Sequence, residues 1–134
     1  MEPLRALLLD VGLLVLRVGV GALMLFGHGL GKALRYATLS ATFADPLGIG
    51  SIHSLNLAIF AELVCSGMVI IGLATRVAAL NVVATMGVAA FVVHRADPWP
   101  KPELAIAYLI PFLAIALIGP GRYSFDGYRS KASG

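Results

Sequence analysis

Four long apolar runs fill most of this chain and constrain its fold more than any other feature. They cover residues 7–27, 55–73, 77–93 and 103–118. A helix needs about 20 apolar residues to cross the hydrocarbon core of a bilayer, and the runs are close to that length. A soluble helix would carry a polar face on every turn, whereas 77–93 carries none. The runs therefore predict an all-α integral membrane protein.

The connections between the runs predict how the helices are arranged. The second link, 74–76, is so short that the second and third spans must form a tight antiparallel pair. The longest link, 28–54, is expected to form a cap on the outer face. We predict one domain over 1–134, an antiparallel up-down-up-down four-helix bundle. The basic residues near the links favour, by a small margin, an orientation with both termini in the cytoplasm.

Composition excludes several other classes of protein. Hydrophobic residues make up 59% of the chain and charged residues only 13%, which is incompatible with disorder and too apolar for a soluble globule of this size. The single cysteine, Cys65, rules out a disulfide within the chain. The net charge of +3 is small and not gathered in one patch, so nucleic acid is not an expected partner.

Two charged residues lie inside the apolar runs. A charge at the bilayer centre costs about 2.5 to 3.5 kcal/mol on insertion scales, so such residues are expected to be paired. Arg17 lies ten residues past Leu7 in the first run, and Glu62 lies eleven residues before Leu73 in the second. Because the two spans are antiparallel, these depths predict an Arg17–Glu62 ion pair. That pair would either staple the two helices or form a polar site within the membrane.

A stripe of polar and small residues follows one face of the first span. Arg17, Gly21, His28 and Lys32 are separated by four, seven and four residues, which places them on one side of a helix. Tyr108 and Glu103 of the last span, and His94 at the end of the third, approach the same end of the bundle. These groups are expected to converge above the Arg17–Glu62 level.

The chemistry of this set suits a quinone. A quinone head needs hydrogen-bond donors for its two carbonyls, an apolar slot for its tail and a group that exchanges protons. The predicted quinone-binding residues are Arg17, His28, Lys32, Glu62 and Tyr108. A metal site through His28, His94 and Glu103 is a weaker alternative, because no H-x-x-H or E-x-x-H spacing supports it and Lys32 would repel a cation. Simple snorkelling of the polar side chains at the interface is the structural alternative. No metal, haem or flavin is predicted.

The closing segment, residues 119–126, has a structural interpretation of its own. It reads Gly-Pro-Gly-Arg-Tyr-Ser-Phe-Asp, and its glycines and proline end the last span at the membrane surface. Arg122 is expected to meet lipid headgroups or the second link. Asp126 is expected to pair with Arg122 or Arg76. We interpret these three residues as groups that fix helix ends.

The chain resembles the DoxX family of four-span membrane proteins. The resemblance rests on Arg17, on His28-Gly29 followed by Lys32, on Glu62 and on the closing G-P-G-R-x-S-x-D pattern at 119–126. It implies a multi-pass protein of the cytoplasmic (inner) membrane of a prokaryote. It also implies a quinone-interacting subunit of a membrane oxidoreductase complex, such as those linked to thiosulfate:quinone oxidoreduction, with the electrons supplied by partner subunits.

Two other functions are compatible with the sequence. One is a non-catalytic scaffold or assembly subunit that organises a larger complex through its glycine-lined spans, which include Gly19, Gly21, Gly27, Gly29 and Gly31. The other is a small-molecule transporter formed by a homo-oligomer, which the lack of a visible inverted repeat makes less attractive.

Overall fold

The computed structural model describes residues 1–133, and almost all of them belong to helices. The first span is one unbroken helix composed of α1 (Glu2–Met24), the π-helical segment η1 (Leu25–Gly29) and α2 (Leu30–Leu34). The short α3 (Tyr36–Leu39) follows it. The second span comprises α4 (Ser51–Ile59), the π-helical η2 (Phe60–Cys65) and α5 (Ser66–Ile71).

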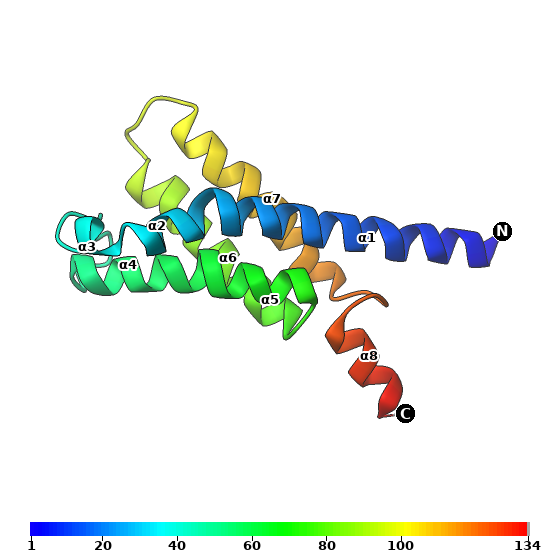
Figure 1. Cartoon of the computed structure of the whole chain (residues 1–134). Helices are drawn as coiled ribbons and strands as arrows, with labels where there is room; N and C mark the ends of the chain where they lie inside the picture. The colour runs from blue at the N-terminus through cyan, green and yellow to red at the C-terminus, as the bar shows by residue number, and fades with distance from the viewer. Residues whose placement is uncertain (134) are drawn as a thin grey trace.

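The remaining helices complete a four-span bundle. The third span comprises α6 (Thr75–Val88) and the π-helical η3 (Ala89–Val93), the fourth is α7 (Lys101–Ile118), and α8 (Phe125–Ala132) follows as a short separate helix. All four spans are long and apolar enough to cross a membrane, and successive spans run in opposite directions (Figure 1). The predicted all-α membrane bundle is confirmed.

The limits of the first span differ from those expected. The helix runs from Glu2 through Leu34, 33 residues in all, so His28 and Lys32 lie inside it and not in a capping link. Residues 51–54, also assigned to the link, begin the second span. At about 1.5 Å per residue the first span is about 50 Å long. Its N-terminal part projects beyond the other three spans (Figure 1).

We refer to the two ends of the bundle by what they carry. The terminal end carries residues 72–74 and both termini, and the loop end carries residues 35–50 and 94–100. At the terminal end the chain reverses through Gly72, with φ of 76°, and leaves the last span through Gly119, with φ of 102°. Both values lie in the left-handed region that glycine adopts without strain, which explains why these helices end there.

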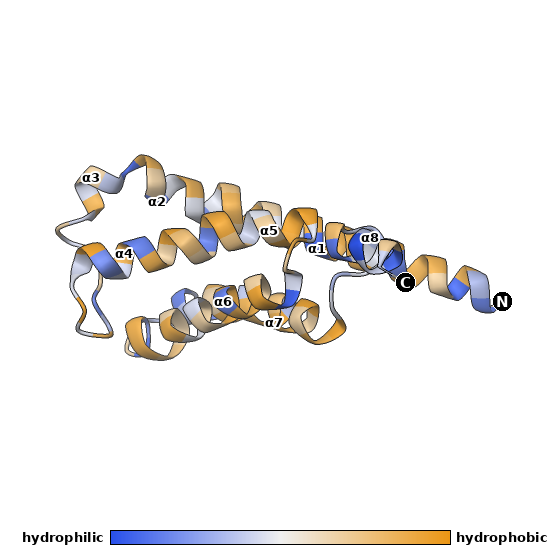
Figure 2. Cartoon of the chain, turned by 90° about the horizontal axis from the view of Figure 1, so that it is seen from below, coloured by the Kyte–Doolittle hydropathy of each residue, from blue (hydrophilic) through white to orange (hydrophobic). Residues whose placement is uncertain are grey.

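The interior of the bundle is narrow and the outer surface is apolar. Met24, Leu55, Val69, Phe112 and Ile115 are fully buried, whereas many leucines and valines face outward. Hydrophobic residues accordingly cover the outer sides of the spans (Figure 2). In a soluble protein such a surface would be unusual, but here it meets the hydrocarbon of the lipid.

A close backbone contact joins the first two spans at their π-helical segments. A Cβ added at Gly29 in η1 would lie 2.6 Å from the backbone carbonyl carbon and oxygen of Glu62 in η2. Only a glycine allows this approach. π-helical turns are rare and occur often at functional sites, and here two of them face each other beside a buried carboxylate.

We expect Gly29→Ala to destabilise the bundle by about 1 to 3 kcal/mol, the usual cost of overpacking a tight contact. The measurement is thermal unfolding in detergent micelles. Gly19→Ala is the matched control, because a methyl group there would meet none of residues 1–133 outside its own helix within 4 Å. Equal unfolding temperatures for the two variants would contradict the close packing at Gly29.

Candidate functional site

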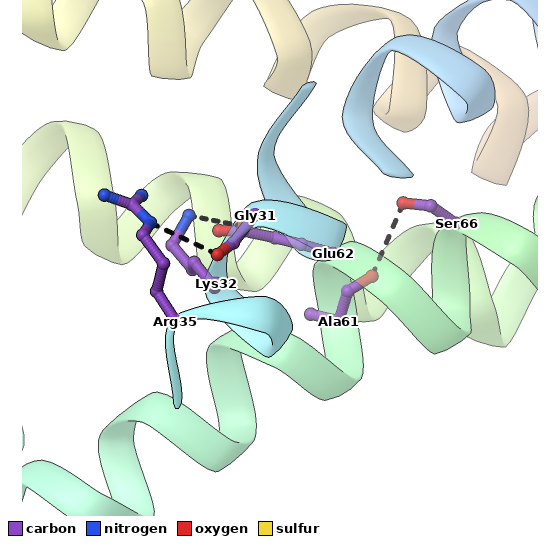
Figure 3. A network of polar contacts seen from close by, with 6 residues as sticks. All are labelled: Gly31, Lys32, Arg35, Ala61, Glu62 and Ser66. Carbon is purple, nitrogen blue, oxygen red and sulfur yellow. Dashed lines mark hydrogen bonds and ion pairs between the residues drawn. The ribbon is translucent and has the colours of Figure 1, made fainter. Parts of the chain in front are cut away.

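A buried ion pair occupies the centre of the candidate site. Lys32 Nζ donates a hydrogen bond to Glu62 Oε2 at 2.5 Å. The Glu62 side chain is 5% exposed and that of Lys32 is 21% exposed. Figure 3 shows Lys32 reaching from the first span across to Glu62, which lies near the middle of the second. Each charge would be costly to bury alone, and the short contact offsets much of that cost.

This pairing corrects the predicted Arg17–Glu62 pair. Arg17 lies beside Ile70, far along the second span from Glu62, while Gly29 lies beside Glu62. The predicted depths were counted from Leu7, as if the membrane began at the first apolar residue. The N-terminal part of that helix instead projects beyond the other three spans (Figure 1), so its later residues, such as Gly29, face Glu62.

A histidine and a tyrosine stack beside the ion pair. The rings of His28 in η1 and Tyr108 in α7 meet edge to face, with centroids 5.1 Å apart and planes at 82°. Both rings line a cavity of about 110 Å³ that also touches Lys32 and Glu62. The structure therefore brings four of the five predicted site residues together, and Arg17 is the exception.

A larger apolar cleft opens on the other side of the ion pair. Its volume is about 460 Å³, within the range of small-molecule sites. Apolar side chains form most of its wall, and polar groups are few. The lining residues are Lys32, Phe43, Ala44, Pro46, Leu47, Ser54, Leu57, Ala58, Phe60, Ala61, Glu62, Asn81, Ala84, Thr85, Val88, Ala89, Val93 and His94. We call this space the main cleft and the cavity beside Tyr108 the small cavity.

His94 lies where the main cleft and the small cavity meet, because it lines both. Its Nδ1 contacts Asp97 Oδ2 at 2.6 Å, and Lys101 Nζ lies 3.8 Å from the same oxygen. The hydrogen bond with His94, together with the charge of Lys101, lowers the pKa of Asp97. An ionised Asp97 would hold the imidazole in one orientation.

Sequence reasoning missed several residues of the main cleft. Asn81 and Thr85 are one helical turn apart on α6, a spacing that marks a shared face. Each bonds within its own helix, Asn81 Nδ2 to Val77 O and Thr85 Oγ1 to Asn81 O. The loop residues Phe43 and Leu47 gave no signal of their own, because only the fold brings them to the cleft. Glu103, the third residue of the alternative metal site, is exposed. It does not line the small cavity that His28 and His94 share.

Arg17 belongs to a second polar cluster, at the terminal end. Its guanidinium donates to Pro120 O, to Tyr123 O at 2.6 Å and, through Nε, to Ile70 O at 3.4 Å. The residue is only 2% exposed. Ile70 lies at the C-terminal end of α5 and Pro120 just after that of α7, where the helix dipole favours a cation, whereas Tyr123 lies in the link just before α8. Arg17 therefore binds the first span, the second span and the closing segment together.

Two other residues of this cluster fix helix ends. Arg76 Nη1 donates to the carbonyls of Ala116 and Leu117 at 3.0 and 2.9 Å, at the end of α7. Asp126 accepts from Ala74 N at 3.0 Å and from the backbone N and Oγ1 of Thr75, both at 2.9 Å. The carboxylate thus caps the start of α6.

The pairing predicted for Asp126 is corrected by these contacts, since the carboxylate binds backbone and hydroxyl donors in place of Arg122 or Arg76. Arg122 is exposed at the terminal end, and its backbone N–H donates to Asp10 Oδ1 at 3.4 Å. The closing segment could not reveal the partners of Asp126, because Ala74 and Thr75 lie 52 and 51 residues earlier in the chain.

Comparison with known proteins gives one match. The DoxX family model matches residues 12–95, which is more than half of the chain. The matched region contains Arg17, His28, Lys32 and Glu62 and ends before Tyr108 and the closing segment. No match was found among curated proteins or among solved structures.

We expect Asp126→Ala to lower the stability at neutral pH by about 1 kcal/mol, the usual effect of losing a helix N-cap. Burial by itself would raise the pKa of Asp126, but the hydrogen bonds from Thr75 and Ala74 outweigh it, and the pKa is lowered. The native pKa thus lies below the unfolded value of about 3.9. The stabilising contribution is therefore present above that value and is lost as the pH falls through the native pKa.

Unfolding of the wild type and of Asp126→Ala in detergent, compared over a series of pH values from neutral into acid until Asp126 is protonated, checks this linkage. The difference between them should disappear in acid. Asp10→Ala is the control, since the Asp10 carboxylate accepts one long hydrogen bond of 3.4 Å. A difference that persists in acid, or one matched by the Asp10 variant, would contradict the assigned cap.

Proposed function

The chain belongs to the DoxX family of membrane proteins, and we propose that it is a quinone-binding subunit of a membrane oxidoreductase complex. The quinone head would lie against the Lys32–Glu62 pair, and the tail would occupy the main cleft. The observation that supports this proposal is that an apolar cleft of about 460 Å³ has a buried ion pair in its wall. A subunit that served only as a scaffold would not need an ion pair in the wall of an apolar cleft.

The main cleft suits the tail of a quinone, and the ion pair suits its head. The cleft offers mostly apolar surface, from residues such as Leu57, Phe60 and Val88, which suits an isoprenoid tail. Lys32 has three donor hydrogens, of which one is used by Glu62, so others are available for a quinone carbonyl. Asn81 and Thr85 provide further polar atoms along the wall.

The proton-exchanging groups surround the same place. A bound quinone supplies two-electron, two-proton redox chemistry, and the electrons would come from a partner subunit. Glu62 holds the ammonium of Lys32 in position and can accept or return a proton at its carboxylate. His94 lies at the junction of the main cleft and the small cavity. His28 and Tyr108 would act from the small cavity, behind the ion pair.

We also propose that the protein resides in the cytoplasmic membrane of a prokaryote with both termini in the cytoplasm. Of the ten basic and seven acidic residues, six basic and three acidic lie in the half of the chain's structure toward the terminal end. The other half has four of each. The half with the termini thus has six basic residues against four, and cytoplasmic segments of membrane proteins have an excess of Lys and Arg.

The quinone proposal is tested by extraction and by titration. The wild type, purified with its native lipid, should release quinone that mass spectrometry identifies. Purified protein should then bind a short-chain quinone, and Lys32→Met should weaken that binding about tenfold or more, because a hydrogen bond to a charged group contributes about 1.5 to 3 kcal/mol.

Two further variants complete the test, one as a control and one that alters the main cleft. Arg95→Met removes an exposed cation of the loop end and should leave the affinity unchanged. Ala84→Phe keeps the ion pair but fills the main cleft from its wall, and it should also weaken binding. The proposal fails if the wild type neither carries nor binds quinone, or if Lys32→Met and Ala84→Phe both bind it as well as the wild type does. A scaffold role is then the better explanation.

A further inference from the structure

The short helix α8 has two different faces. Along its helical turns Phe125, Tyr128 and Ala132 lie on one side, flanked by Arg129 and Lys131. Phe125 is 49% and Tyr128 is 72% exposed. Asp126, on the other side, is held by the start of α6. The aromatic side of α8 is therefore not used in packing the bundle.

The surroundings of α8 are basic and lie at the edge of the membrane. The last span ends at Ile118 and α8 begins at Phe125, so six residues separate it from the hydrocarbon-crossing part. Between them Arg122 is exposed and Tyr123 is 41% exposed. Figure 1 shows α8 turning away from the direction of the spans. Asp126 is the acidic residue of this segment, and hydrogen bonds already occupy its carboxylate.

We propose that α8 and Arg122 form a docking surface for the anionic headgroups of the leaflet at the terminal end. Phe125 and Tyr128 would insert at the boundary between headgroups and acyl chains, and Arg122, Arg129 and Lys131 would bind the lipid phosphates. Aromatic rings beside basic residues, on an amphipathic helix that follows a span, are the arrangement that binds such an interface. Charge complementarity selects an anionic leaflet over a zwitterionic one.

The role of this surface is separate from quinone binding. The Lys32–Glu62 pair lies near the middle of the second span, and α8 lies beyond the end of the fourth. Docking on lipid would brace the closing segment, whose carbonyls hold Arg17. Loss of either function would therefore leave the other measurable.

Hydrogen–deuterium exchange of the α8 amides tests the docking surface. The full chain is placed in nanodiscs of phosphatidylcholine alone or of phosphatidylcholine mixed with phosphatidylglycerol. Exchange in the wild type should be at least about fivefold slower with phosphatidylglycerol, since each Lys or Arg near an anionic surface contributes about that factor. The combined Arg122→Gln, Arg129→Gln and Lys131→Gln variant should lose this slowing.

A matched variant removes three cations at the other end of the bundle. Arg35→Gln, Arg95→Gln and Lys101→Gln together should retain the slowing, because these residues lie at the loop end. The proposal is overturned if wild-type exchange is the same in both lipids, or if the slowing survives removal of the three α8 cations. Raising the salt concentration should reduce the wild-type effect.

Discussion

The ion pair between Lys32 and Glu62 is the interaction on which the rest of the site depends. Two opposite charges near the middle of a membrane protein are tolerable only when they are in contact and shielded from lipid. The 2.5 Å contact and the near-complete burial of Glu62 meet both conditions. Gly29 lets the first span approach the backbone beside Glu62, so the packing and the electrostatics reinforce each other at one place.

The candidate site and the groups that fix the helix ends lie in different halves of the molecule. Around the ion pair, three π-helical segments, two cavities and a His28–Tyr108 stack leave space between the helices. At the terminal end, by contrast, Arg17 and Arg76 satisfy backbone carbonyls and Asp126 satisfies backbone amides. Ends fixed in this way allow the opposite half to keep an open cleft without loosening the bundle.

The fold could be predicted from the sequence, and so could the gathering of His28, Lys32, Glu62 and Tyr108 in one place, whereas the pairing could not. The length and apolarity of the four runs are sufficient for a four-span bundle, because a bilayer admits few alternatives. The His28–Lys32 spacing also places both residues on one face correctly. The partner of Glu62 depends on the offset between two helices, and the projecting start of the first span shifts that offset beyond what residue counting can detect.

The residues of the main cleft illustrate a second limit of prediction from the sequence. Ala84 and Val88 are indistinguishable in sequence from residues that face lipid, and Phe43 lies in a loop far from them along the chain. They share a cleft only because the π-helical segments and the loop end bring them together. The capping role of Asp126 was hidden for the same reason, since its donors lie at the start of α6.

A double-mutant cycle on Lys32 and Glu62 tests the central claim most directly. Unfolding of the wild type, Lys32→Met, Glu62→Gln and the double variant is measured in the same detergent. A buried pair predicts that each single variant loses about 3 to 5 kcal/mol and that the double variant loses much less than their sum, because no unpaired charge remains. Additive losses, or single variants as stable as the wild type, would contradict the claim that this pair organises the interior.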